Sequence, residues 1–387
     1  MKKTLKDYSF DYKTVLLRCD LNVPMENDKI LDDTRIVASL DTINYLISNK
    51  AKVVIFSHLG KVKAEGDKKN NSLYQVYLRL CQLLKCRCYF SSELRGTQLE
   101  KKINDMNYGE VLLVENTRFL DVPDNLESGC DDKLSKYWAS LGDVFVNDAY
   151  GTCHRGHASN AGIAKYLPSA LGLLVENEVN KLSGMMNENT HPFVVIMGGK
   201  KISDKTLVID NLVKKCDKIL IGGGMCFTFF KAMGINIGNS IVDDDNIEYC
   251  KNILDKYKSK IFLPVDIINQ NGKVRDIRDL RDNDTGYDIG PETINLFCKE
   301  LKKARRVIIN GPMGMYEDKR FANGTKELYS YLKDNKIKTL IGGGDSAASV
   351  NELGFNGVFY HVSTGGGATL EYLSGKKLPG IEVINDK

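Results

Sequence analysis

The sequence predicts an α/β protein made of two doubly wound parallel-sheet domains joined by a hinge helix. Apolar runs rich in β-branched residues alternate with segments of helical period along the whole chain, as parallel strands and crossover helices do. The chain has 387 residues, which is too long for one ordinary core and fits two domains of roughly 150 to 200 residues each. The strand pattern also restarts after a polar, helix-compatible stretch near the middle. These observations favour two Rossmann-like halves.

The first half of the chain supplies the first set of alternating elements. The strand candidates are residues 13–23, 51–59, 110–118 and 143–150. Helices are expected over 32–49, with Asp32 or Asp33 as the N-cap, and over 72–85.

The second half repeats this pattern. Its strand candidates are residues 192–199, 218–224, 260–268, 305–314, 338–344 and 357–367. The polar segment 172–189 lacks strand signal and is the best hinge candidate. We therefore expect an N-terminal domain over 1–170, a connecting hinge helix over 171–190, a C-terminal domain over 191–370, and a segment over 371–387 that returns to the N-terminal domain.

Composition excludes several classes of protein. The chain is 42% hydrophobic and 27% charged, which is ordinary for a globular protein, and its formal charge of +4 is too small for a nucleic-acid surface. No signal peptide and no run of about 18 apolar residues is visible, so we expect a cytoplasmic protein with no membrane partner. The ten cysteines form no C-x-x-C pair and are expected to be reduced and structural.

Three glycine triplets in the second half follow apolar runs, and they end at Gly224, Gly344 and Gly367. Glycines between a strand and a helix let backbone amides close on an anion, with the helix dipole behind them. Tightly packed strand-to-helix turns also need glycine, which is the alternative for each triplet alone. Three triplets together, with MGGKK at 197–201, favour a polyphosphate ligand.

The usual nucleotide signatures are mostly missing. No G-x-x-x-x-G-K-[ST] loop occurs, and the G-x-G-x-x-A match at 342–347 lacks an acidic residue about 20 positions later. Asp345 follows these glycines at an expected helix start. Its carboxylate could hold a Mg²⁺ that bridges nucleotide phosphates, or it could be a simple N-cap.

Two lysines after MGGK are candidates for phosphate contact. Lys201 and Lys205 are expected at the start of a helix, one turn apart and on one face, with Lys200 beside them. Surface lysines are the ordinary explanation for this spacing. Like charges at that spacing repel unless an anion lies between them, which favours the phosphate interpretation.

The first half carries a different set of cationic side chains, at or after the ends of strand candidates or opening a helix. The carboxyl ends of the strands face the ligand crevice in an open α/β sheet, and the arginine fork suits carboxylate or phosphate. A small, doubly anionic substrate is therefore expected, although each side chain alone could form a surface ion pair. The set is Arg35, His58, Arg118, His154, Arg155 and His157.

With these residues in view, the chain resembles the phosphoglycerate kinase family from end to end. The first half contains RCDLNVP at 18–24, DDTRI at 32–36, FSHLGK at 56–61, VENTRF at 114–119 and VNDAYGTCHRGHAS at 146–159. The second half contains GGKKISDK at 198–205, IGGGM at 221–225, LPVD at 263–266, DIGPET at 288–293, NGPMGMYE at 310–317, GGGDSAA at 342–348 and STGGGATLEYL at 363–373.

The resemblance implies reversible phosphoryl transfer between 1,3-bisphosphoglycerate and Mg-ADP, giving 3-phosphoglycerate and Mg-ATP in glycolysis. It also implies a monomer that closes about a hinge for in-line transfer. An acyl phosphate is a good donor, so catalysis needs alignment and charge neutralisation rather than a nucleophile or strong base. Closure would also exclude water from the reacting group.

The resemblance also assigns roles by position. It implies that the N-terminal domain binds phosphoglycerate through Asp20, Leu21, Asn22, Arg35, His58, Leu59, Gly60, Lys61, Arg118 and Arg155. It implies that the C-terminal domain binds nucleotide through Lys205, Gly222, Gly290, Asn310, Pro312, Glu317, Gly343, Gly344, Asp345 and Ser346, with Asp345 at Mg²⁺. The implied catalytic residues are Arg35, Lys201, Lys205, Gly344 and Gly367.

Several positions depart from the family's usual pattern. Lys200 stands where a small residue is normal, Lys61 replaces an arginine, Ile309 replaces a tryptophan, and Ser374 replaces an acidic residue. Ser346 replaces a threonine and keeps the hydroxyl. No departure removes a group that the mechanism needs, and we expect Lys61 and Lys200 to alter affinity or product release more than chemistry.

Two other functions fit parts of the sequence. A dinucleotide-dependent oxidoreductase would use the turn at 342–347, but the ribose-binding acid is missing. A non-catalytic binding or scaffold protein descended from the kinase would explain the departures, but Arg35, Lys201, Lys205 and Asp345 are all retained.

Overall fold

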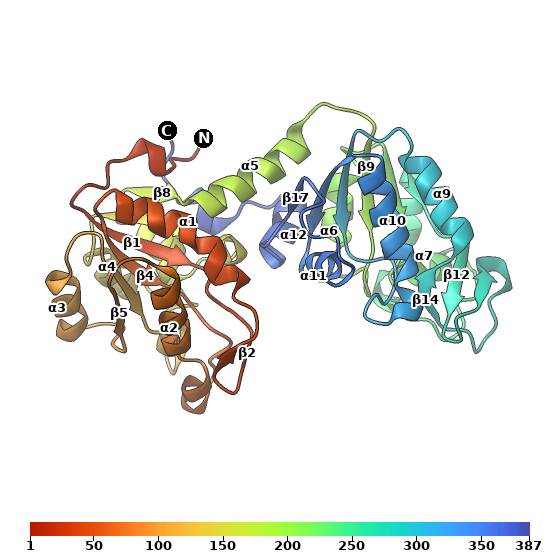
Figure 1. Cartoon of the computed structure of the whole chain (residues 1–387). Helices are drawn as coiled ribbons and strands as arrows, with labels where there is room; N and C mark the ends of the chain where they lie inside the picture. Colours follow the sequence, from red (N-terminus) through yellow and green to blue (C-terminus); the bar gives the residue numbers. More distant parts are fainter. The chain divides into compact units, whose positions relative to one another are not determined.

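The structure, a computed structural model, describes residues 1–387 and divides into two compact units. Unit 1 comprises Met1–Asn180 and Lys377–Lys387, and unit 2 comprises Lys181–Lys376. The division falls inside helix α5 (Leu173–Asn187), which occupies the predicted connector. Each unit contains a six-stranded, wholly parallel sheet, so the predicted α/β fold class is confirmed (Figure 1).

Unit 1 is built on a parallel sheet with the strand order β5-β6-β4-β1-β7-β8. Its strands are β1 (Thr14–Cys19), β4 (Lys52–Phe56), β5 (Cys88–Ser91), β6 (Val111–Val114), β7 (Val144–Asp148) and β8 (Ser169–Leu171). Its helices are α1 (Thr34–Ser48), α2 (Tyr74–Leu83), α3 (Thr97–Asp105), α4 (Asp132–Ala139) and, in the C-terminal segment, α13 (Pro379–Glu382). A short antiparallel pair, β2 (Met25–Glu26) and β3 (Lys29–Ile30), precedes α1.

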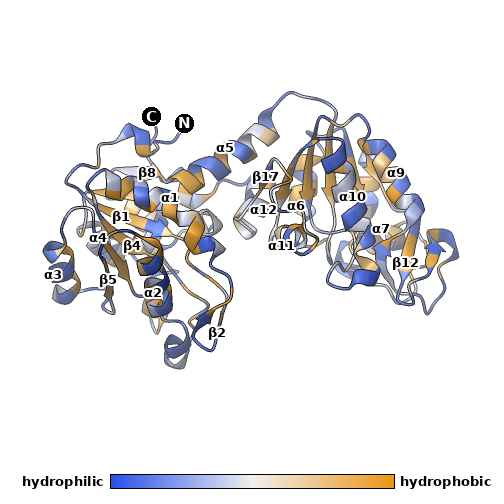
Figure 2. Ribbon diagram, in the orientation of Figure 1, coloured by the Kyte–Doolittle hydropathy of each residue, from blue (hydrophilic) through white to orange (hydrophobic).

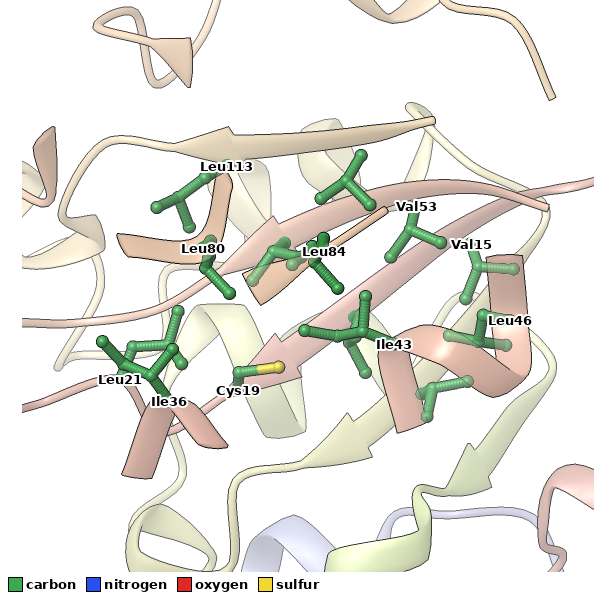
Figure 3. Close-up of a cluster of buried hydrophobic side chains, with 14 of the residues drawn as sticks. Val15, Cys19, Leu21, Ile36, Ile43, Leu46, Val53, Leu80, Leu84 and Leu113 are labelled. Atoms are coloured by element: carbon green, nitrogen blue, oxygen red, sulfur yellow. The ribbon is translucent and has the colours of Figure 1, made fainter. Parts of the chain in front are cut away.

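Both faces of this sheet are apolar because its strands carry nearly continuous hydrophobic runs (Figure 2). On one face, Ile43 of α1 and Leu80 of α2 pack with Val15, Val53 and Leu113 of the strands (Figure 3). The opposite face is covered by α4, whose Trp138 ring centroid lies 5.1 Å from that of Phe56. This rigid, two-sided core holds the carboxyl ends of the strands in place.

Unit 2 repeats the arrangement with the strand order β11-β10-β9-β15-β16-β17. Its parallel strands are β9 (Phe193–Met197), β10 (Lys218–Ile221), β11 (Ile261–Phe262), β15 (Arg306–Asn310), β16 (Lys338–Gly342) and β17 (His361–Val362). Its helices, besides the end of α5, are α6 (Thr206–Leu212), α7 (Cys226–Ala232), α8 (Ile247–Tyr257), α9 (Pro291–Leu301), α10 (Asn323–Asp334), α11 (Gly344–Glu352) and α12 (Gly367–Leu373).

Some elements differ from the sequence prediction. The candidate strand 260–268 splits into β11 and β12 (Asp266–Asn269), because Pro264 between them cannot donate to a ladder. Strand β12 joins β13 (Val274–Asp276) and β14 (Gly286–Ile289) in an antiparallel sheet that the sequence does not predict. Strands β5 and β8 were also missed, since both are short strands at the edges of their sheet.

The prediction that Lys201 and Lys205 share a helical face is wrong. Residues 203–205 form a turn, in which the Lys205 amide donates to the Ile202 carbonyl oxygen at 2.8 Å. Helix α6 begins only at Thr206, and Lys205 is its N-cap residue. The preceding Gly199 has a φ of +98°, so the chain turns sharply after β9 rather than entering a helix directly.

Candidate active site

Unit 1 has a cationic pocket of about 490 Å³ beyond the carboxyl ends of its central strands. The loops after β1, β4, β6 and β7 contribute to it, as expected for a ligand crevice in an open parallel sheet. No carboxylate lines it. The lining residues are Asn22, His58, Gly60, Lys61, Val62, Lys63, Arg118 and Arg155.

The positions of the pocket loops are fixed by hydrogen bonds between neighbouring loops. The Gly60 amide donates to Asn22 Oδ1 at 2.8 Å, which joins the loops after β1 and β4. Asn116 Nδ2 donates to the Leu59 carbonyl oxygen at 2.7 Å, which adds the loop after β6. The Leu21 amide donates to Ser57 Oγ at 2.9 Å. Leu21 and Leu59 therefore support the pocket through their backbones.

The cations of the pocket crowd one another. Burial lowers the pKa of the Arg118 guanidinium, and the charge of nearby Arg155 lowers this pKa further. Arginine stays charged in proteins, so this crowding is an electrostatic cost of the ligand-free state. A doubly charged anion would relieve that cost. Lys63, which was not predicted from the sequence, adds another cation to the lining.

Asp20 and Arg35 form an ion pair beside the pocket but are not among its lining residues. Arg35 lies in the first turn of α1, and Asp20 follows β1 directly. A Cβ at Gly151 would lie 2.4 Å from Asp20 Oδ2, so the loop after β7 lies directly against this carboxylate. Asp20 thus holds the Arg35 guanidinium beside the loop after β7.

A buried polar network supports His58 from within the unit. Arg18 Nη2 lies 3.3 Å from His58 Nδ1, and Arg18 Nε donates to Ser159 Oγ at 2.8 Å. Ser159 Oγ in turn donates to Glu127 Oε1 at 2.5 Å. Burial, and then the charge of Arg18, lowers the pKa of His58 well below its usual value, so the imidazole is neutral.

Arg18, Ser159 and Glu127 were not predicted from the sequence as functional residues. The sequence does contain a signal for Arg18, because an arginine stands inside the apolar run TVLLRC. In this strand the side chains on both faces of the sheet are buried. Arg18 is fully buried, and a buried guanidinium needs partners.

Unit 2 brings several glycine loops into close contact at the ends of β9, β10 and β15. The Gly198 amide donates to the Asn310 carbonyl oxygen, and the Gly199 amide donates to that of Pro312, each at 2.9 Å. A Cβ at Gly311 would lie 2.2 Å from the Gly198 carbonyl oxygen. Gly198 and Gly311 are therefore required for close backbone packing, and this explanation holds whatever ligand is bound.

Two glycines expected at the nucleotide also have packing reasons. A Cβ at Gly222 would lie 2.6 Å from Met313 Sδ, and one at Gly290 would lie 2.3 Å from the carboxyl group of Asp266. Gly344 is different, because nothing lies within 4 Å of a Cβ built there. Gly344 is exposed at the first position of α11, where its backbone amide is free to meet a ligand.

The cationic residue most closely built into unit 2 is Lys205. Its Nζ donates to Asn310 Oδ1, and Asn310 Nδ2 donates to the Gly342 carbonyl oxygen at 2.8 Å. Burial lowers the pKa of Lys205 to about 8, while the nearby carboxylate of Asp345 opposes that shift. Lys200 and Lys201, by contrast, are exposed.

Asp345 lies in the first turn of α11, but Gly343 is the N-cap residue of this helix. The alternative that Asp345 is a simple N-cap is therefore wrong. Next to it, Ser346 Oγ accepts a hydrogen bond from the Gly311 amide at 2.6 Å, which joins α11 to the loop after β15. Asp345 is exposed, so its carboxylate can reach a ligand.

The remaining predicted residues of unit 2 lie on neighbouring loops. Pro312 is buried and Glu317 is exposed, and both follow β15. Gly367 is exposed and is the first residue of α12. The preceding Gly366 has a φ of +51°, which favours glycine at this turn. Each glycine triplet thus lies where a strand gives way to a helix, and the triplets ending at Gly344 and Gly367 include the first residue of that helix.

These features define a class of protein. One α/β unit presents a cationic pocket for a small anion, and the other presents glycine loops, a half-buried lysine and an exposed carboxylate at helix starts. Such a pair of sites is typical of a phosphotransferase, in which catalysis rests on positioning and neutralising phosphoryl oxygens.

Comparison with known proteins identifies the family. The phosphoglycerate kinase family model matches residues 5–376. The chain is 49% identical to the phosphoglycerate kinases of Macrococcus caseolyticus (strain JCSC5402), over 399 residues, and Enterococcus faecalis (strain ATCC 700802 / V583), over 397 residues. All of each chain is covered in both comparisons. The chain therefore belongs to the phosphoglycerate kinase family, and the resemblance seen in the sequence is confirmed.

Solved structures agree with this assignment. The structure of phosphoglycerate kinase from Coxiella burnetii matches with a TM-score of 0.89 and 34% identity, over 99% of this chain and 98% of that chain. Phosphoglycerate kinase from Pyrococcus horikoshii OT3 matches with a TM-score of 0.84 and 32% identity, over 98% of each chain. The dinucleotide-dependent oxidoreductase is not supported. No helix of the protein is long and apolar enough to span a membrane.

Proposed function

We propose that this protein catalyses the reversible transfer of a phosphoryl group from 1,3-bisphosphoglycerate to Mg-ADP, giving 3-phosphoglycerate and Mg-ATP in glycolysis. The observation that carries the proposal is the family match, which extends over residues 5–376 and includes both units. The reaction is a phosphotransfer with a carboxyl group as acceptor in the reverse direction.

The cationic pocket of unit 1 is the proposed site for the glycerate substrate. Arg118 and Arg155 suit its non-transferred phosphate and carboxyl oxygens, because an arginine fork binds such groups with two parallel hydrogen bonds. Neutral His58 can donate a hydrogen bond without adding charge. Lys61 keeps the positive charge of the arginine that is usual in this family, but it lacks the planar guanidinium that binds two oxygens at once.

Unit 2 is the proposed nucleotide site. Backbone amides at Gly343 and Gly344 and at the start of α12 can receive phosphate oxygens, since the first amides of a helix lack internal partners. Pro312 and Glu317 line the proposed nucleoside side of the site. Lys205, held by Asn310, lies where its ammonium group can neutralise phosphoryl oxygens.

A magnesium ion fits this chain as a metal carried by the nucleotide. The exposed Asp345 supplies one carboxylate ligand at the start of α11, whereas no group of three or more His, Cys, Asp or Glu side chains could hold a metal ion. Mg²⁺ in kinases is commonly bound by one or two carboxylates together with substrate phosphates and waters. When bound, the ion supplies charge neutralisation between the phosphates.

The chemistry requires that the acyl phosphate and the nucleotide meet in line. We propose that Arg35 of unit 1 and Lys205 of unit 2 neutralise the equatorial oxygens of the group in transfer, together with Lys201 and the amides of Gly344 and Gly367. No residue has to act as a nucleophile or strong base, because the acyl phosphate is already activated. The protein is proposed to work as a monomer.

Separate binding measurements test this division of labour. Titration calorimetry on Arg118→Gln is expected to show 3-phosphoglycerate binding weakened by about 10- to 100-fold, the loss of one charge-assisted bond, with Mg-ADP binding unchanged. Asp345→Asn is expected to weaken Mg-ADP binding and to leave 3-phosphoglycerate binding unchanged. If either variant impaired both ligands equally while remaining folded, the assignment of one ligand to each unit would be wrong.

A further inference from the structure

Three cysteines meet at an edge of the unit 1 sheet, outside the proposed substrate pocket. Cys81 lies in the last turns of α2, Cys86 lies in the loop that follows, and Cys88 is the first residue of β5. Strand β5 pairs only with β6, so it is the edge strand of the sheet (Figure 1). All three thiols are free and partly exposed, which leaves them accessible to small reagents.

The chain geometry brings Cys86 and Cys88 close together. Residues two positions apart can be separated by no more than about 7 Å between their Cα atoms, and a disulfide needs about 4.4 to 6.8 Å. The chain bends at Cys86 and straightens at Cys88. Cys88 Sγ lies 3.8 Å from the Cys86 carbonyl oxygen, so the Cys88 side chain reaches back toward Cys86.

The neighbouring thiols also affect one another's pKa. Interaction with the Cys88 thiol lowers the pKa of the Cys86 thiol, although its partial burial and the charge of Glu110 oppose that shift. The same interaction, and then burial, raises the pKa of Cys88. Cys86 is therefore the better nucleophile, because the thiolate is the reactive form.

The other cysteines of the chain lack this arrangement. Cys153 and Cys226 are buried, and burial raises the pKa of both. Cys298 is partly exposed like Cys86, but burial raises its pKa to about 11. Cys298 can therefore serve as an internal control for Cys86. The two cysteines are both partly exposed, but Cys298 has no neighbouring thiol that lowers its pKa.

We propose that Cys86 and Cys88 form a peroxide-sensitive dithiol that closes reversibly to a disulfide. The Cys86 thiolate attacks one oxygen of hydrogen peroxide, the O–O bond breaks, and the departing hydroxide takes a proton to become water. Cys88 sulfur then attacks the sulfenic sulfur of Cys86, forming the S–S bond, and the second oxygen leaves as water with the Cys88 proton. Two thiols lose two electrons, which reduce one peroxide to two waters.

A disulfide in so short a loop is expected to be reversible. Closure between residues two positions apart strains the bond, and strained disulfides are more easily reduced than structural ones. The modification requires none of the residues proposed for substrate or nucleotide binding. Its test can therefore be read independently of the proposed phosphotransferase activity.

The experiment treats the folded full-length protein with hydrogen peroxide and then blocks remaining thiols for peptide mass spectrometry. We expect a Cys86–Cys88 disulfide, lighter by two hydrogen atoms, that forms before Cys298 is oxidised and that dithiothreitol reverses. Cys88→Ser should instead accumulate sulfenic acid at Cys86, which dimedone traps. Cys81→Ser should still form the Cys86–Cys88 disulfide, and Cys298→Ser should behave as the wild type.

Several results would overturn the proposal. Oxidation of Cys86 no faster than that of Cys298 would remove the claimed reactivity. A Cys81–Cys88 disulfide, or a disulfide between two copies of the chain on a non-reducing gel, would show that the partners are wrong. Failure of Cys88→Ser to trap a sulfenic acid at Cys86 would contradict the order of the two steps.

Discussion

Among single residues, Lys205 is the side chain on which the proposed phosphoryl transfer depends most. This lysine is the N-cap residue of α6, and its ammonium group is held by Asn310 near the carboxylate of Asp345. Removing a preorganised charge that stabilises a transition state typically costs about 100- to 1,000-fold in kcat. Lys205→Ala is therefore expected to lower kcat by that range in a steady-state assay.

Lys215→Ala is the matched control for this variant, because Lys215 is an exposed lysine of the same unit. It should leave kcat within about two-fold of the wild type. Loss of activity in Lys215→Ala equal to that in Lys205→Ala would show that general charge, not position, matters.

The titration of Lys205 predicts a specific pH dependence. Because burial lowers its pKa to about 8, the ammonium group is charged below that pH and loses its proton as the pH rises through it. The value of kcat/KM, which reports groups of the free enzyme, should therefore fall above about pH 8. In Lys205→Arg the charge persists, so the profile of this variant should stay flat between pH 8 and 9.5 even if its activity is lower. If kcat/KM of Lys205→Arg fell above pH 8 as in the wild type, the fall would belong to the titration of another group.

At the scale of elements, the start of α5 depends on a buried carboxyl group. Asp148 ends β7, and its Oδ1 accepts the Leu174 amide at 2.9 Å in the first turn of α5. Burial raises the pKa of Asp148 from 3.8 to about 7. The folded protein therefore keeps this proton between about pH 4 and 7, whereas the unfolded chain releases it.

The sign of the effect follows from that difference. The loss of folding stability caused by burying Asp148 is absent below about pH 4, grows as the pH rises, and is complete above about pH 7. A shift of about three pKa units corresponds to a loss of about 4 kcal/mol in the free energy of unfolding. Asp148→Asn keeps the acceptor and removes the titration. We expect its free energy of unfolding, measured by denaturant, to exceed that of the wild type by more at pH 7 than at pH 4. An unchanged difference between the two pH values would contradict the buried titration.

Helix α2 provides a second test at this scale. Leu80 is 1% exposed and packs on the sheet, whereas Leu78 of the same helix is 38% exposed. Leu80→Ala should lower the free energy of unfolding by about 2 to 5 kcal/mol, because it opens a cavity in the core. Leu78→Ala should cost less than about 1 kcal/mol. Equal losses would mean that α2 does not pack as described.

The elements also show how far sequence reasoning reaches. Buried central strands such as β1 and β15 were predictable, because nearly continuous hydrophobic runs are typical of parallel strands. The antiparallel sheet around β12 was not, because its strands are only three or four residues long and β12 was joined to β11 in one predicted strand. The turn before α6 was also missed, since the lysine spacing suggested a helix where residues 203–205 form a turn.

At the scale of the whole molecule, each unit carries its own set of site residues, and the sequence revealed most of them through motifs. The pocket in unit 1 includes the predicted Asn22, His58, Gly60, Lys61, Arg118 and Arg155. The supporting Arg18–Glu127 network was missed. Arg18 stands out as a charged residue in an apolar strand, but nothing in the sequence identifies its distant partners Ser159 and Glu127. Sequence reasoning also could not show that Gly222 and Gly290 are fixed by packing.

The central claim is that these two sites act on one phosphoryl group. The most direct measurement is ATP formation from 1,3-bisphosphoglycerate and Mg-ADP by the full-length protein, followed in a coupled assay beside the folded Lys205→Ala variant. The account predicts rapid ATP formation by the wild type and a loss of about 100-fold or more in the variant. ATP formation at background by a folded wild-type protein that still binds 3-phosphoglycerate and Mg-ADP would contradict it and leave only a binding role.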